Sequence, residues 1–270
     1  MQTGFTAVCR KRFDAYAASF AAPDGGFPFG IRIKIGHTAD VCRIMEDLTP
    51  PDTDERTGQM LYLTALCHDI SRFEQYQKFQ TFRDSDSFDH GERSAELIRS
   101  EKILEGLPEE EIAIISEAVR LHNRITLPET CPGGVQRLVA ELIRDADKLA
   151  ILELLIRFFQ SPPELAEAAA TKMDLPETPG WTEDVLAAAV AGRQIRHCEL
   201  KNVNDFKLML FTWIHDFNSP LAAEYALTHN LYPTARTLLP ADPAMDHLLE
   251  LTQQFLEKKA KEQINYGEYR

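Results

Sequence analysis

The sequence predicts an all-α protein, and two observations support this fold class. Apolar residues recur with helical spacing along most of the 270 residues. Alternating, β-branched patterns are nearly absent, and the only candidate strand is the short segment FGIRIKIG at residues 29–36. Stretches rich in turn residues, such as APDGGFPFG, LTPPDTDE and DLPETPGW, separate the periodic segments.

The periodic segments between these breaks predict the helices one by one. In chain order we expect helices over residues 5–20, 37–48, 57–78, 90–104, 109–123, 133–159, 164–172, 182–196, 202–215, 219–228, 232–238 and 243–263. The densest turn signals between long helices fall between residues 160 and 182. We therefore predict a helical core over residues 1–160 and a C-terminal helical extension over residues 161–270 that packs on the core.

Composition and charge restrict the class of partner. The chain is 44% hydrophobic and 26% charged, which is typical of a globular protein. Its formal net charge of −13 and the lack of a basic stripe argue against binding to a nucleic-acid polymer. No run approaches 18 apolar residues and the N-terminal segment lacks a signal layout, so we expect no membrane partner.

The cysteines indicate the compartment. The chain has five, Cys9, Cys42, Cys67, Cys131 and Cys198, scattered and without a C-x-x-C pair. This pattern favours free thiols in a reducing environment and argues against a disulfide framework or a thiolate zinc site. We therefore predict a cytoplasmic protein.

The segment GQMLYLTALCHDISRFE contains an unexpected polar pair. Its helical stripe runs through Leu61, Ala65, His68 and Arg72, so His68 points toward the core with Asp69 beside it. Burying a carboxylate costs several kcal/mol unless it is compensated. A metal ion, a salt bridge or exposure at a helix end would each compensate it.

Three further histidines fall at inward positions of other predicted helices. The segment HTADVCRIMEDL begins with His37, SFDHGERSAELI opens its helix at His90, and EEIAIISEAVRLHN carries His122 on the face of Ile115 and Val119. One such histidine is more often a satisfied core residue than a ligand. Four on separate helices favour convergence on one site.

An acidic residue on a fifth helix completes the set. The segment QRLVAELIRDADKLAILELL is an apolar helix interrupted by Arg144, Asp145, Asp147 and Lys148. Asp145 and Asp147 each lie on an apolar stripe, so periodicity alone does not choose between them. Arg144 and Asp145 are candidates for a pair that orients a histidine ligand.

Imidazoles and carboxylates together form a mixed nitrogen–oxygen site. Such a site suits iron, manganese, zinc or nickel, and the absence of thiolates argues against a structural zinc cage. Six groups exceed the needs of one tetrahedral ion, so we infer two ions that share a bridging Asp69.

The order of these residues resembles a known signature. His37, His68-Asp69, His90, His122 and Asp147 match the H…HD…H…H…D pattern of the HD-domain superfamily of metal-dependent phosphohydrolases, over residues 37 to 155. The segment KNVNDFKLMLFTWIHDFN resembles the C-terminal half of a mostly uncharacterised bacterial group of HD proteins.

The resemblance implies a helical bundle around the metal site and assigns its ligands. Four residues match the basic HD motif: His37, His68, Asp69 and Asp147. His90 and His122 match the extra pair of two-metal members, in which Asp69 would bridge. The resemblance favours Asp147 over Asp145 as the last ligand.

Three residues are predicted to act in catalysis, namely Asp69, Arg72 and Lys148. Arg72 lies three residues after Asp69, where its guanidinium would clamp a phosphate with two hydrogen bonds. Lys148 adjoins Asp147 and either meets a phosphate or lies on a solvated helix face. Several two-metal relatives have glycine then lysine where this chain has Ser71 and Arg72.

Two further features limit the interpretation. The G-Y-P motif of cyclic-dinucleotide enzymes is missing after His122, which argues against that substrate. A second H-D pair, His215-Asp216, lacks companion histidines at matching spacing and is expected to pack rather than to bind metal.

The resemblance implies a hydrolase that cleaves a phosphomonoester or phosphoanhydride of a small, nucleotide-like substrate through a metal-bridging hydroxide. We expect two divalent ions per chain, iron or manganese first, with zinc, nickel, cobalt and magnesium as alternatives. Two other functions remain open. One is an HD-fold di-iron oxygenase with the same ligands, and the other is a nucleotide-binding regulatory module without turnover.

Overall fold

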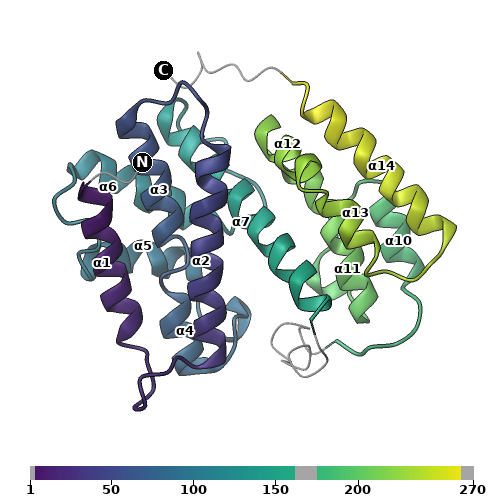
Figure 1. The fold of residues 1–270 in the computed structure, drawn as a ribbon, viewed down its shortest axis with the longest axis horizontal. Coiled ribbons are helices and arrows are strands. Elements are labelled where there is room, and N and C mark those ends of the chain that lie inside the picture. The colour runs from purple at the N-terminus through teal and green to yellow at the C-terminus, as the bar shows by residue number, and fades with distance from the viewer. Residues whose placement is uncertain (1–3, 162–174, 263–270) are drawn as a thin grey trace. The chain divides into compact units, whose positions relative to one another are not determined.

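The computed structural model describes residues 4–161 and 175–262, and its regular elements are helices (Figure 1). Over these ranges the extended structure is limited to one isolated bridge between Glu105 and Leu107. The all-α prediction is therefore confirmed, whereas the helix expected over 164–172 lies outside the described residues. Within the same ranges, no helix combines the length and the apolar character needed to cross a membrane.

The chain divides into two compact units, the first extending to Asp147 and the second beginning at Lys148. The first unit contains α1 (Gly4–Ala18), α2 (Phe29–Leu48), α3 (Glu55–Cys67), α4 (Arg72–Phe79), α5 (His90–Ser100), α6 (Glu109–Leu121) and the first half of α7 (Val135–Phe159). The second contains the rest of α7 with α10 (Glu183–Val190), α11 (Val203–Thr212), α12 (Pro220–Thr228), α13 (Leu231–Arg236) and α14 (Pro243–Lys259). The predicted division into a core over residues 1–160 and an extension over residues 161–270 stays a prediction.

In the first unit, α3 is the central helix. It packs against α1, α2 and α6, and α5 packs along α6 (Figure 1). Leu61, Leu63, Ala65 and Leu66 of α3 are completely buried, so the helix is apolar on nearly all sides. The polar residues that follow α3 therefore emerge at the middle of the unit.

Side-chain caps fix where two of these helices begin. Asp54 accepts hydrogen bonds from the backbone nitrogen and the hydroxyl of Thr57 at the start of α3. Asp89 accepts from the backbone nitrogens of Gly91 and Glu92 at the start of α5. Such caps satisfy amide groups that have no partner inside the helix. The cap at Asp89 places His90 in the first turn of α5.

The candidate strand FGIRIKIG is helical and forms the first turns of α2. Ile31 is buried whereas Ile33 and Ile35 are partly exposed, so the alternation of isoleucines does not correspond to two faces. Gly30 lies against the ring of Tyr76 in α4, where an added Cβ would meet ring carbons at 2.4 to 2.6 Å. Packing against α4 thus overrides the β propensity of this short segment.

The second unit is built around contacts of α14 with α12 and α13, and of α10 with α11. Ser219 and Asp242 cap α12 and α14, each directly before a proline at the first helical position. The carboxylate of Asp205 is completely buried and accepts hydrogen bonds from the backbone nitrogen and hydroxyl of Thr182. The second unit therefore has a core of its own.

Candidate metal centre

The helix expected over residues 57–78 is broken at the histidine–aspartate pair. The end of α3 is Cys67, residues 68–71 form a turn, and α4 starts at Arg72. The Ser71 hydroxyl donates to the carbonyl of His90, and the Ser71 backbone nitrogen donates to the Ser94 hydroxyl. These bonds fasten the turn to α5, so the break brings the ligand candidates of α3 and α5 together.

The six predicted ligands converge in two buried groups. Each group offers three ligand atoms that all lie within 4.8 Å of one another: His37, His68 and Asp147 in the first, and Asp69, His90 and His122 in the second. We call these groups the first triad and the second triad. Their residues come from α2, the turn after α3, the start of α5, the end of α6 and the middle of α7.

Asp69 belongs to the second triad and also faces the histidines of the first, with a different oxygen toward each pair. Its Oδ1 is 3.6 Å from Nε2 of His90 and 3.7 Å from Nε2 of His122. Its Oδ2 is 3.6 Å from Nε2 of His68 and 3.7 Å from Nε2 of His37. A carboxylate oriented in this way has one oxygen available to each of two ions.

The backbone fixes the tautomers of two histidines. Nδ1 of His68 lies 2.8 Å from the carbonyl of Ala65, and Nδ1 of His122 lies 2.7 Å from that of Val119. A carbonyl only accepts, so each Nδ1 carries a proton, and in the neutral ring each Nε2 presents a lone pair. This is the state in which imidazole binds a metal.

A third histidine is held by a carboxylate that the sequence reasoning missed. Nδ1 of His90 lies 2.5 Å from Oδ2 of Asp84, six residues earlier in the chain. Nε2 of His90 therefore also presents a lone pair, at 3.2 Å from Nε2 of His122. Two facing lone pairs repel unless a cation lies close to both. A carboxylate behind a metal-binding imidazole is a common arrangement in metalloproteins.

Asp147 is the aspartate of α7 that joins the site. Its Oδ1 lies 2.9 Å from Nε2 of His37 and 3.7 Å from Nε2 of His68. This oxygen is buried and has no well-aligned hydrogen bond from the described residues. Asp145 is completely buried as well, but it belongs to neither triad. The structure thus distinguishes two aspartates that periodicity left equivalent.

Burial and neighbouring charges shift the ionisation of the site in opposite directions. Burial lowers the pKa of His68 and that of His90 to about 4, with Arg72 lowering His90 further, so both rings are neutral near pH 7. Burial raises the pKa of Asp69, but Lys34, His68 and Arg72 outweigh it, and the net pKa is well below the usual value. For Asp147, His37, His68 and His122 together outweigh burial, and the pKa is lowered. Neutral imidazoles and ionised carboxylates are what a divalent ion requires.

Two cations contact the buried Asp69. Nζ of Lys34, one helical turn before His37 in α2, lies 2.7 Å from Oδ2. Nε of Arg72 lies 3.3 Å from Oδ1, and its Nη1 lies 3.0 Å from Oδ1 of Asp84. Arg72 therefore lies beside the triads, and its role toward a phosphate stays a prediction; Lys34 was not predicted.

Lys148 lies in the second unit by sequence and pairs there with Asp216. Its Nζ is 2.7 Å from Oδ2 of that aspartate, which belongs to the second H-D pair. The ring of His215 packs against Phe255 with centroids 4.4 Å apart. The role of Lys148 toward a phosphate stays a prediction, and the structure supports a packing role for His215.

The segment after His122 is fixed by Arg144, which is almost completely buried. Its guanidinium donates to the carbonyls of His122, Arg124 and Ile125, the first at 3.4 Å and the last at 3.0 Å. These bonds satisfy carbonyls beyond the end of α6. Arg144 therefore anchors the backbone that carries His122, and its predicted pairing with Asp145 stays a prediction.

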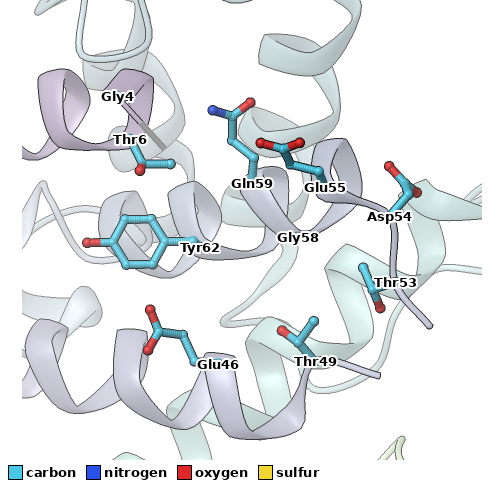
Figure 2. Close-up of a pocket in the computed structure, with 10 residues that line it drawn as sticks. All are labelled: Gly4, Thr6, Glu46, Thr49, Thr53, Asp54, Glu55, Gly58, Gln59 and Tyr62. Carbon is cyan, nitrogen blue, oxygen red and sulfur yellow. The ribbon is translucent and has the colours of Figure 1, made fainter. Parts of the chain in front are cut away.

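A separate cavity of about 800 Å³ opens in the first unit among the starts of α1 and α3 and the end of α2 (Figure 2). It is lined by Gly4, Thr6, Glu46, Thr49, Thr53, Asp54, Glu55, Gly58, Gln59 and Tyr62. None of these belongs to either triad, and the charged ones are all acidic. This cavity therefore does not suit an anionic phosphate.

Comparison with known proteins agrees with this geometry. Residues 35–152 match the family described as HD domain. This part of the chain is an HD domain. The match contains both triads, and the HD domain is that of the metal-dependent phosphohydrolase superfamily. The chain matched neither a curated protein nor a solved structure.

The HD domain's donor set fits a binuclear metal site. Three imidazoles make hydrogen bonds through Nδ1 and turn Nε2 toward the site, Asp69 faces both triads, and a buried oxygen of Asp147 lacks an aligned donor. Such orphaned, converging acceptors are costly without a cation. Histidine and carboxylate ligands are shared by several transition ions, so the donor set leaves the metal open.

Proposed function

We propose that this protein is a metal-dependent phosphohydrolase that cleaves a phosphomonoester or phosphoanhydride of a small, nucleotide-like substrate. The observation that carries the proposal is the placement of Asp69 between two histidine pairs, with one oxygen toward each. A pair of divalent ions, when bound, would supply an activated water and polarise the phosphoryl group.

Residues of the chain would hold the ions, orient the histidines and supply positive charge for the phosphate. His37, His68 and Asp147 would hold one ion, His90 and His122 the other, and Asp69 both. Asp84 holds the proton on Nδ1 of His90, and backbone carbonyls do the same for His68 and His122. Arg72 and Lys34 lie beside these ligands as the nearest positive charges for a phosphate.

The deciding experiment is a phosphate-release screen with metal-stripped and reloaded protein. Manganese- and iron-loaded samples should release phosphate from at least one nucleotide or generic phosphomonoester. Asp69→Asn should lower kcat/KM by about a thousandfold or more, because it removes a charge shared by both triads and metal sites of this kind supply several kcal/mol.

His247→Ala serves as the matched control, because His247 is an exposed histidine in α14. It should leave turnover and metal content unchanged. Iron content with oxygen-dependent turnover and no phosphate release would contradict the proposal and favour an oxygenase. Tight nucleotide binding without any product would instead indicate a regulatory module.

A further inference from the structure

The ammonium of Lys34 has more hydrogen-bond donors than the described protein has acceptors for them. Its side chain is only 13% exposed, and its ammonium has three N–H donors. One points to Asp69, with Nζ 2.7 Å from Oδ2. Within residues 4–161 and 175–262, Lys34 has no other hydrogen-bond or ion-pair partner. Two of its N–H groups therefore have no protein acceptor there.

The alternative is that Lys34 serves only to neutralise Asp69. Arg72 already contacts the other oxygen of that carboxylate, at 3.3 Å. Arg72 has a second carboxylate of its own, Asp84, at 3.0 Å, whereas Lys34 has none. In a site that also binds divalent ions, Asp69 would face still more positive charge. Lys34 is therefore surplus to what Asp69 needs.

The ring of Phe82 lies beside the ammonium of Lys34. Its Nζ lies 5.2 Å from the ring centroid of Phe82, and the Arg72 guanidinium lies 5.8 Å from the same ring. Phe82 stacks on Tyr76 with ring centroids 5.2 Å apart, and the ring of Tyr76 packs against Gly30. The two cations are thus held over one ring, in the distance range of a cation–π contact.

The charges of the site indicate the charge of its ligand. Without metal, the three carboxylates of Asp69, Asp84 and Asp147 exceed the two positive charges of Lys34 and Arg72 by one. Two divalent ions would leave the site strongly positive. An anion with two negative charges offsets this excess better than one with a single charge.

We propose that Lys34 binds the phosphoryl group of the substrate and makes the site selective for a dianionic, terminal phosphate over a phosphodiester. This inference rests on the proposed function and names its substrate class. A terminal phosphate has three non-bridging oxygens and a second negative charge near neutral pH. A diester has two such oxygens and a single charge, so it would leave Lys34 less well paired.

The first test measures phosphate binding rather than turnover. Manganese-loaded protein is titrated with inorganic phosphate by calorimetry, above the second pKa of phosphate. Lys34→Met should weaken binding by about tenfold or more, the value of one hydrogen bond to a charged group. Arg32→Met removes a charge from the same helix, where Arg32 is exposed, and should leave binding unchanged.

Metal content is measured for each variant at the same time. Weakened phosphate binding with both ions retained supports the proposal. Unchanged binding in Lys34→Met, or weak binding explained by loss of an ion, overturns it. If Lys34→Met does not fold, Lys34→Arg and Lys34→Gln replace it. Binding kept in the arginine variant and lost in the glutamine variant supports the proposal, and equal behaviour of the two overturns it.

The second test compares p-nitrophenyl phosphate with bis-p-nitrophenyl phosphate. The wild type should prefer the monoester, and Lys34→Met should lower the ratio of the two kcat/KM values by about tenfold. A preference for the diester in the wild type would overturn the selectivity. If the wild type hydrolyses neither ester, the proposed function fails, while the phosphate titration still decides whether Lys34 binds phosphate.

Discussion

Asp84 determines how His90 presents its ring to the second triad. Its Oδ2 lies 2.5 Å from Nδ1 of His90, and its Oδ1 lies 3.0 Å from Nη1 of Arg72. Burial raises the pKa of Asp84, but His90, Arg72 and Gln75 together outweigh burial and lower the pKa, so the carboxyl is ionised. The carboxylate thereby fixes the protonated nitrogen of His90 and leaves Nε2 free for a ligand.

Asp84→Asn should therefore lower the affinity of the second triad for its ion by about 10- to 100-fold, the usual cost of losing such a hydrogen-bond partner. The first triad should change little, because Asp84 does not touch it. Metal titration against a chelator of known affinity measures both sites. Asp86→Asn is the control, since Asp86 lies in the same short helix (Asp84–Asp86) and is exposed. An equal loss of metal affinity at both triads would contradict this role of Asp84.

The site residues that the sequence predicted have a local signal in the sequence, and those that it missed do not. His37, His68 and His122 interrupt apolar stripes, so the helical period alone marks them as inward. Asp84 and Lys34 lie in a turn-rich stretch and in a segment resembling a strand. Their roles depend on long-range contacts with His90 and Asp69, which no local pattern encodes.

At the scale of elements, the approach of α5 to α6 sets the distance between His90 and His122. Gly91 makes this approach close: an added Cβ would lie 2.9 Å from the carbonyl of Arg120 and 2.8 Å from Oδ1 of Asn123. A backbone carbonyl at this distance does not move without shifting the helix. The second triad therefore depends on a glycine next to one of its ligands.

Gly91→Ala should force α5 and α6 apart and lower the free energy of unfolding by about 1 to 3 kcal/mol, the typical cost of overpacking. It should also lower the affinity of the second triad for its ion. Chemical denaturation and metal titration measure these effects.

Gly36→Ala is the contrasting variant, because Gly36 lies inside α2 with nothing within 4 Å of an added Cβ. It should leave stability unchanged or raise it by up to about 1 kcal/mol, since alanine is the better helix former. A stable Gly91→Ala protein that keeps both ions would show that α5 has room to adjust.

The helix boundaries show where local pattern is sufficient. The long periodic segments of α6, α7 and α14 were predicted to within a few residues. The single helix expected over 57–78 is wrong, because hydrogen bonds of Ser71 to α5 stabilise a turn at residues 68–71. The strand candidate was also overridden by packing, here of Gly30 on Tyr76. In each case a partner distant in sequence decides the outcome.

At the scale of the whole molecule, the two triads belong to one unit only. The six ligand candidates end at Asp147, and the second unit begins at the next residue. A ligand that binds the folded state stabilises it by mass action. The increase in stability is expected in the part of the protein that must be folded for the ligand to bind. Metal should therefore stabilise the two units unequally, although α7 contributes to both.

Hydrogen exchange measured by mass spectrometry should show this difference. Adding manganese to stripped protein should slow exchange in α2, in the turn after α3, and in α5 and α6. It should change α10 to α14 little. With the ion at 100 times its dissociation constant, the gain is about 2.7 kcal/mol, or roughly a hundredfold slower exchange for amides that open only by unfolding of the first unit. Asp69→Asn with manganese should exchange like the stripped wild type, because both triads lose their shared carboxylate. Equal protection of α14 and α3 would indicate instead that the two units unfold as one cooperative structure.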